Sequence, residues 1–316
     1  MKRAALADTD LAVSSLCLGG NVFGWTADEK NSFEVLDAYV GAGGNFVDTA
    51  DMYSVWAEGH VGGESETLVG KWMKERGDRS SVIVATKVAK LQTRPGLSAA
   101  NIEAACDDSL KRLQTDYIDL YYAHEDDESV PMEETLGAFG RLVEAGKVRH
   151  IAASNFEAPR LAEALRFSAD NDLPKYVAIQ PQYSLLSRST FEGGLEDVCQ
   201  SSGLSAFPYW ALASGYLTGK YQAGPVDSPR ADGISRYANL PQSDAVLREL
   251  AKIADGRKVS IASIALSWCL SHPSVPSVIA SARDVAQLSE LVGLVQLSDE
   301  ECAVLNAAST GSPQLP

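Results

Sequence analysis

The sequence predicts an α/β protein with the (β/α)8 architecture of a TIM barrel, formed by one domain that spans residues 1–316. Short segments rich in β-branched and aromatic residues alternate with segments whose apolar residues recur at helical spacing. The first seven strand segments begin roughly 28–37 residues apart, which is the rhythm of repeated βα units around a parallel sheet. A length of 316 residues is also usual for one barrel of this kind.

The N-terminal half is expected to hold a β hairpin and four βα units. Residues 1–14 alternate weakly in polarity, which favours a hairpin ahead of the barrel. The first helix is expected to be capped at Thr26, because Thr26 and Glu29 have capping-box spacing, and to stop at Gly41 or Gly43. The predicted strands are 15–19, 45–49, 82–86 and 117–123. The first and third helices are expected to start after caps at Thr26 and Ser98, and the second and fourth to cover 64–73 and 132–145.

The C-terminal half continues the alternation and then departs from it. Residues 213–242 are rich in Gly, Pro and Ser without clear periodicity, and we expect a long functional or mobile loop there. Helices late in the chain are expected to be additions to the barrel. The predicted strands are 148–153, 176–180, 204–209 and 275–280, and the predicted helices are 157–169, 193–202, 243–255, 260–270, 284–294 and 299–308.

Composition and charge exclude several classes of function. The net charge of −15 argues against nucleic acid or an anionic membrane as a partner. No apolar run approaches a membrane span, and the start of the chain lacks the apolar segment of a signal peptide. The five cysteines are scattered without a CxxC pair, so we expect reduced thiols in a cytoplasmic protein and no metal site.

Polar residues gather at the predicted strand ends, where a barrel of this kind carries its chemistry. The segment 43–53, GGNFVDTADMY, contains a short strand that runs into Asp48, with Tyr53 five residues later. Lys87 ends the third strand and His124 follows the fourth. Four titratable side chains from three consecutive strands would meet at one mouth, and this convergence is typical of an active site rather than of packing.

These residues lie in segments that resemble the aldo-keto reductase family, and the resemblance extends over nearly the whole chain. The family implies nicotinamide-dependent reduction of an aldehyde or ketone to an alcohol, with Asp48, Tyr53, Lys87 and His124 as the catalytic tetrad. The segments that carry the resemblance are GGNFVDTADMY, GGESETLVG, VATK, YIDLYYAHEDDESVPMEETL, GKVRHIAASNF, IQPQYS, YWALASGYLTGKY and VIASARDVAQLSEL.

The chemistry of the four side chains agrees with these implied roles. Hydride addition to a carbonyl leaves negative charge on the oxygen, which must receive a proton, and we expect Tyr53 to donate it. A free tyrosine with a pKa of about 10 is a weak acid, so Lys87 is expected to lower the pKa of Tyr53 while Asp48 balances the lysine charge. His124 is expected to polarise the substrate oxygen. No metal is required.

The resemblance also implies an NADP(H) site. No GxGxxG motif follows an early strand, so a Rossmann domain is not expected to bind the nicotinamide. Amide and hydroxyl side chains would hold the nicotinamide, Tyr209 would stack on its ring, and Arg283 would face a 2′-phosphate. Two departures from related sequences are Leu291, where Asn is usual, and Trp210-Ala211, where Ser-Pro is usual. The cofactor-binding residues expected are Gly20, Asn21, Asp48, Ser154, Asn155, Gln180, Tyr209, Leu212, Ser214, Gly215, Leu217, Lys220, Arg283 and Gln287.

The substrate is expected to be a small neutral carbonyl compound that contacts Trp25, Tyr53 and His124, and a monomer is the simplest assembly. The run 125–128 places four carboxylates after His124, and one that faced the mouth would repel anions. Further aromatic residues that could line the pocket or pack in the core are Trp56, Tyr183, Trp210 and Tyr216.

Two other functions remain open from the sequence. Some members of the family are cofactor-binding regulatory subunits of membrane channels, so a redox-sensing or regulatory subunit with little turnover is the main alternative. A barrel lyase or isomerase unrelated to the family is the other alternative. It would need no nicotinamide and would leave Arg283 without a role.

Overall fold

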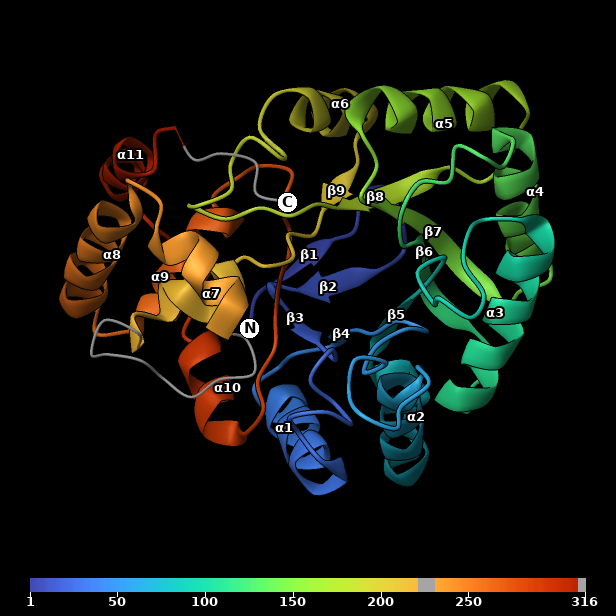
Figure 1. Ribbon diagram of the computed structural model, residues 1–316, viewed down its shortest axis with the longest axis horizontal. Coiled ribbons are helices and arrows are strands. Elements are labelled where there is room, and N and C mark those ends of the chain that lie inside the picture. Colours follow the sequence, from blue (N-terminus) through green and yellow to red (C-terminus); the bar gives the residue numbers. More distant parts are fainter. Residues whose placement is uncertain (221–230, 312–316) are drawn as a thin grey trace.

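The computed structural model describes residues 1–220 and 231–311, and its strands form a central sheet ringed by helices (Figure 1). All neighbouring strands of the eight-stranded sheet are parallel, in the order β10-β3-β4-β5-β6-β7-β8-β9. The strands are β3 Leu16–Gly19, β4 Phe46–Asp48, β5 Ile83–Val88, β6 Ile118–Ala123, β7 Val148–Ser154, β8 Tyr176–Gln180, β9 Ser205–Ala206 and β10 Val278–Ala280. This is the predicted (β/α)8 fold.

The two ends of the sheet are joined by backbone hydrogen bonds rather than by a regular ladder. The amide of Ala206 donates to the carbonyl of Ser274 at 2.7 Å, and the amide of Ile279 donates to the carbonyl of Pro208 at 3.0 Å. The predicted strands 204–209 and 275–280 are therefore present, but each is shorter than expected. These bonds join β9 to β10, and the direct parallel pairing of β10 with β3 brings the ends of these two strands side by side in the site described below.

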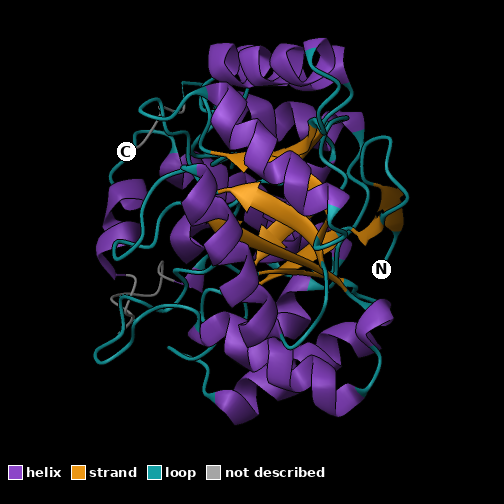
Figure 2. Cartoon of the chain, turned by 90° about the vertical axis from the view of Figure 1, so that its right-hand side faces the viewer, coloured by secondary structure: helices purple, strands orange, loops and turns teal. Residues whose placement is uncertain are grey.

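Helices surround the sheet, as the side view also shows (Figure 2). Short 3-10 segments occur at η1 Arg79–Ser81 and η2 Ala213–Thr218. The helices are α1 Glu29–Gly41, α2 Glu64–Arg76, α3 Ala99–Leu113, α4 Met132–Glu144, α5 Ala158–Asp170, α6 Gly194–Ser202, α7 Ala231–Ala238, α8 Ser243–Arg257, α9 Ile261–Leu270, α10 Val285–Leu291 and α11 Asp299–Ala308. No helix within 1–220 and 231–311 is long and apolar enough to cross a membrane.

The predicted hairpin is present as β1 Arg3–Ala5 and β2 Ala12–Ser14, paired antiparallel. Leu6 and Leu11 from its turn pack into the cluster that fills the barrel interior, together with Phe46 and Leu120. The hairpin therefore plugs the end of the barrel where the strands begin. The opposite end, at the C-terminal ends of the strands, is not filled by this hairpin and carries the polar side chains described below.

Two expectations about local structure were wrong. Helix α1 is capped by Asp28, whose side chain accepts from the amide of Asn31 at 2.8 Å, and not by Thr26. A carboxylate at this position also interacts favourably with the helix dipole, which a threonine hydroxyl does not. The region 213–242 contains η2 and α7 instead of one long loop, although residues 221–230 lie outside the described part of the chain.

Candidate active site

Period-two alternation along neighbouring strands places three side chains on one inner face at the barrel mouth. Phe46 and Ala85 belong to the cluster inside the barrel, so Asp48 and Lys87, each two residues later, point to the same side. Tyr122 also belongs to that cluster, and His124 follows it at the same spacing. The strand register sets Asp48 opposite Ala85 and Lys87 opposite Tyr122, so the polar ends of β4, β5 and β6 meet.

Asp48, Tyr53 and Lys87 form a closed triangle of hydrogen bonds. Nζ of Lys87 donates to Oδ2 of Asp48 at 2.7 Å and to the hydroxyl of Tyr53 at 2.9 Å, and that hydroxyl donates to the same Oδ2 at 3.1 Å. Nζ also donates to the carbonyl of Thr49 at 2.8 Å, so its three acceptors match the three protons of an ammonium group. Lys87 is fully buried, and this geometry holds its charge against the phenol.

The pKa of Tyr53 lies well above its ordinary value, which corrects the expectation that Lys87 would lower it. Burial raises this pKa most, because it removes the phenolate from water, and the Asp48 carboxylate raises it further. Nζ of Lys87 donates to the phenol oxygen at 2.9 Å, and this contact does not bring the pKa of Tyr53 down to its ordinary value. Tyr53 is consequently a protonated hydroxyl at neutral pH, which is the form that a proton donor requires.

His124 is neutral at neutral pH for the complementary reason. Burial lowers its pKa well below the ordinary value, and the positive charges of Lys87 and Lys90 lower it further. Its ring lies edge-on to that of Tyr53, with centroids 6.1 Å apart. Within the described residues its Nδ1 is buried without a hydrogen-bond partner. A neutral imidazole carries one N–H group, which can donate to a substrate oxygen beside the phenol.

The expected nicotinamide-binding side chains form a connected network at the ends of β7 and β8. The hydroxyl of Tyr209 donates to Oδ1 of Asn155 at 2.8 Å, and Nδ2 of Asn155 donates to the carbonyl of His124 at 2.8 Å. Oγ of Ser154 donates to the carbonyl of Gln180 at 2.9 Å, and Nε2 of Gln180 donates to Oδ1 of Asp48 at 2.9 Å. The network ties this side of the pocket to the catalytic triangle.

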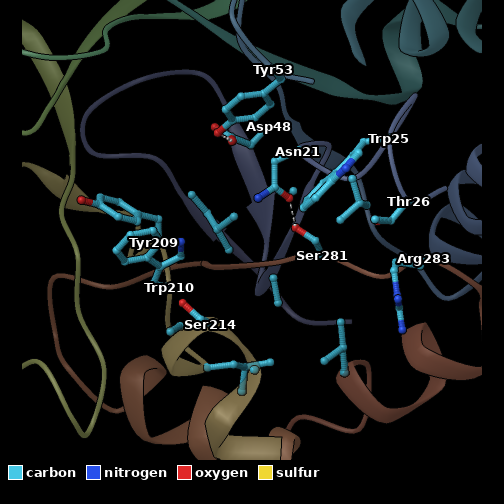
Figure 3. A pocket seen from close by; sticks show the side chains of 18 of the residues that line it. Asn21, Trp25, Thr26, Asp48, Tyr53, Tyr209, Trp210, Ser214, Ser281 and Arg283 are labelled. Carbon is cyan, nitrogen blue, oxygen red and sulfur yellow. Dashed lines mark hydrogen bonds between the residues drawn. The ribbon is translucent and has the colours of Figure 1, made fainter. Parts of the chain in front are cut away.

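The far side of the pocket lies between the ends of β3 and β10 and helix α10. Oγ of Ser281 donates to Oδ1 of Asn21 at 2.6 Å. Arg283 lies across the pocket from Tyr209 and Trp210, as Figure 3 shows. Its backbone amide donates to Oε1 of Gln287 at 3.2 Å. A positive side chain at one end and an aromatic ring with amide groups at the other suit a molecule with a phosphate and a carboxamide, so the residues fit a nicotinamide dinucleotide.

Comparison with known proteins agrees with this geometry. A sequence profile described as the Aldo/keto reductase family matches residues 15–310. The chain belongs to the aldo-keto reductase family. Among its relatives, the uncharacterized oxidoreductase YrpG of Bacillus subtilis is 35% identical, covering 94% of this chain and 92% of its own. Protein tas of Escherichia coli is 33% identical over 95% of each chain, and a probable voltage-gated potassium channel subunit beta of Arabidopsis thaliana is 33% identical over 92% of this chain and 90% of its own.

Most of the residues expected from the family line the same pocket, and three do not. One of the three is Lys87, which is fully buried against Asp48 and Tyr53. Leu217 is fully buried in the core, and Gly20 lies behind the pocket wall, where a Cβ would come within 2.7 Å of Oγ of Ser65. Gly19 lines the pocket in its place. The expected cofactor residues that do line it are Asn21, Asp48, Ser154, Asn155, Gln180, Tyr209, Leu212, Ser214, Gly215, Lys220, Arg283 and Gln287.

The two departures from related members of the family both lie in the pocket wall. Leu291 lines the pocket near Arg283 and is almost fully buried. Trp210 is 43% exposed, has a positive φ of 52°, and packs edge-on against Tyr209 with centroids 5.5 Å apart. Positive φ also occurs at Asn155 and Ser214, and such backbone strain gathers at functional sites.

The substrate end of the pocket is aromatic. Trp25 packs edge-on against Trp56 with centroids 5.7 Å apart, and Tyr53 lies 6.1 Å from Trp56 by the same measure. Trp25, Trp56 and Trp210 all line the pocket, whereas Tyr183 and Tyr216 are core residues outside its lining. Sequence reasoning missed Thr26, Lys90, Thr218 and Ser281, which also line it. For Lys90 and Ser281 the available signal was their place just after a strand end.

No residue of the acidic run 125–128 lines the pocket, although Glu125 pairs with the lining residue Lys90 at 3.3 Å. Asp126 accepts from both Nε and Nη2 of Arg160, at 2.7 and 3.1 Å. Asp127 accepts from the amide of Leu97 at 2.9 Å, and none of residues 125–128 is among the lining. Groups of His, Cys, Asp and Glu that could hold a metal do not occur in the part of the chain that the structure describes.

Proposed function

We propose that this member of the family is an NADP(H)-dependent enzyme that reduces an aldehyde or ketone to an alcohol, with Tyr53 as the proton donor. The observation that carries the proposal is the Asp48–Tyr53–Lys87 triangle, closed at 2.7–3.1 Å, with His124 beside it. Family membership supports carbonyl reduction in general. The choice of NADP(H) and the role of each residue are part of the proposal.

Each side chain has a distinct task in this mechanism. A bound reduced nicotinamide supplies the hydride. Tyr53 gives its hydroxyl proton to the carbonyl oxygen as negative charge develops there, and the Lys87 hydrogen bond to the phenol oxygen stabilises the phenolate that remains. Asp48 keeps Lys87 charged and in place. Neutral His124 donates its single N–H to the same oxygen, so two donors fix the carbonyl before the proton moves.

The cofactor assignment uses the pocket lining. Ser154, Asn155 and Gln180 present hydroxyl and amide groups suited to a carboxamide, and Tyr209 presents a ring that can stack on nicotinamide. Arg283 would read a 2′-phosphate in this proposal, because a guanidinium binds phosphate with two parallel hydrogen bonds. We assign residues 1–316 to a single domain that acts in the cytoplasm on small carbonyl compounds.

The test is a panel of aldehydes and ketones assayed by oxidation of NADPH and NADH, with Tyr53→Phe as the decisive variant. Phenylalanine keeps the ring against Trp56 and His124 and removes only the transferable proton. We expect at least about a thousandfold loss of turnover with cofactor affinity unchanged, measured by fluorescence titration. Turnover near the wild-type rate in this variant would refute the role of Tyr53.

The channel-subunit alternative is less well supported. Several relatives are named as potassium channel subunits beta, but the hydrogen-bonded Asp48–Tyr53–Lys87 triangle with His124 beside it supports turnover. An unrelated lyase or isomerase is excluded by the family match.

A further inference from the structure

A strained residue directs the loop that follows β5 into the pocket. Ala89 has a φ of 111°, a conformation that side-chain-bearing residues rarely adopt, and its carbonyl accepts from the amide of Gly96 at 2.9 Å. Ala89 is fully buried, so the surrounding packing maintains this conformation. The next residue, Lys90, lines the pocket together with Tyr53 and His124.

Lys90 lies at the substrate end of the pocket. The amide of His124 donates to the carbonyl of Val88 at 2.8 Å, which holds the ends of β5 and β6 together beside Lys90. The aromatic walls at this end are Trp25 and Trp56. The other cations in the described lining, Lys220 and Arg283, belong to the proposed cofactor side.

The ion pair between Lys90 and Glu125 is weak, so a ligand can displace it at little cost. Nζ of Lys90 is 3.3 Å from Oε2 of Glu125, and the two side chains are 34% and 43% exposed. Half-exposed ion pairs contribute little to stability, because water and salt screen them. The neighbouring carboxylates of Asp126 and Asp127 are held elsewhere by Arg160 and by the Leu97 amide. A carboxylate entering the pocket can therefore take the place of Glu125.

We propose that Lys90 is a specificity-determining residue that selects carbonyl substrates with an anionic group, such as a carboxylate, separated from the carbonyl by an aromatic or apolar body. This inference rests on the proposed function, because it names the substrate class of the same site. The carbonyl lies between Tyr53 and His124, the body of the substrate lies against Trp25 and Trp56, and the anionic end pairs with Lys90.

The test compares 4-carboxybenzaldehyde with its neutral analogue 4-formylbenzamide in the full-length protein at low salt. The measured quantity is the ratio of kcat/KM for the two aldehydes, since the ratio removes effects common to both. Lys90→Met is expected to lower this ratio about tenfold, equivalent to about 1.4 kcal/mol. Glu125→Gln removes the competing carboxylate and is expected to raise it. The matched control Lys71→Met removes a surface lysine paired with Glu29 at 2.7 Å, outside the pocket lining, and should leave the ratio unchanged.

A binding measurement separates this inference from the proposed function. Tryptophan fluorescence reports the affinities of 4-(hydroxymethyl)benzoate and 4-(hydroxymethyl)benzamide in wild type and Lys90→Met without any turnover. Selective loss of benzoate binding in the variant supports Lys90 as the anion-binding residue even if no aldehyde is reduced. Failure of the wild type to reduce any aldehyde would overturn the proposed function instead. Reduction of both aldehydes with an unchanged ratio in Lys90→Met overturns the Lys90 inference alone, and equal effects on both ligands with no turnover overturn both.

Discussion

Replacing Lys87 by Met tests how the buried triangle divides its effect between stability and catalysis. Methionine has nearly the length of lysine and fills the same space, but it donates no hydrogen bond. The change removes three donated bonds at 2.7–2.9 Å and leaves the Asp48 carboxylate without its counter-charge. Asp48 and Lys87 are almost completely buried, so water cannot fully replace what is lost.

The expected loss of stability follows from the unpaired carboxylate. Breaking a buried ion pair by removing one partner costs about 3–5 kcal/mol. Asp48 keeps hydrogen bonds from Gln180 at 2.9 Å and from Tyr53 at 3.1 Å, so we expect a value near the lower end, about 3 kcal/mol. In the double variant Asp48→Asn/Lys87→Met no buried charge remains unpaired, so part of that loss should be recovered.

The expected loss of catalysis follows from the phenolate that forms at Tyr53. A hydrogen bond to a charged group contributes about 1.5–3 kcal/mol, and two unit charges 2.9 Å apart at an effective dielectric constant of ~20 interact by about 6 kcal/mol. An intermediate value of about 4 kcal/mol corresponds to about a thousandfold in the rate of hydride transfer. The double variant should remain as inactive as Lys87→Met.

The assay combines urea unfolding with single-turnover oxidation of bound NADPH. We expect the double variant to recover part of the lost stability and none of the lost activity. Lys87→Met activity within about threefold of wild type would refute the electrostatic role of Lys87. A double variant less stable than Lys87→Met would refute the account of the unpaired carboxylate.

Three further outcomes are expected. Arg283→Ala should weaken the binding of NADPH about 10–100-fold and that of NADH far less, since only NADPH loses a charged hydrogen bond to its 2′-phosphate. The control is Arg257→Ala, which removes a surface pair with Glu301. Equal losses of affinity for both cofactors would contradict the assignment. The kcat/KM for reduction of a neutral aldehyde should be constant from about pH 6.5 to about pH 9. The lowered pKa of His124 keeps the imidazole neutral, and the raised pKa of Tyr53 keeps the phenol protonated, across that range. A titration midpoint within the range would contradict this expectation. Gly70→Ala should destabilise the protein by about 3 kcal/mol in urea unfolding, because a Cβ would come 2.2 Å from the carbonyl oxygen of Arg112 where α2 crosses α3. The control Gly41→Ala should cause no such loss, since a Cβ at Gly41 would have nothing within 4 Å.

The fold and the convergence of polar side chains at the barrel mouth were predictable because they depend on short-range patterns. Alternation along β4, β5 and β6 puts Asp48, Lys87 and His124 on the face that points into the barrel, and parallel strands bring such positions to one end. The boundary at α1 was predicted wrongly, because Thr26 and Asp28 are both acceptable caps by sequence and only the chain path selects Asp28.

The sequence by itself determined the barrel and the convergence of Asp48, Tyr53, Lys87 and His124 at one end of it, since strand alternation and strand-end positions follow from residue spacing. Only the tertiary structure decided the pKa of Tyr53, which depends first on burial and then on the nearby Asp48 carboxylate. It also decided that Lys90 enters the pocket while Asp126 and Asp127 turn away, and that Gly19 rather than Gly20 lines the wall. Side-chain directions in loops and the electrostatics of buried groups are set by contacts between residues far apart in the chain, and local spacing carries no record of those contacts.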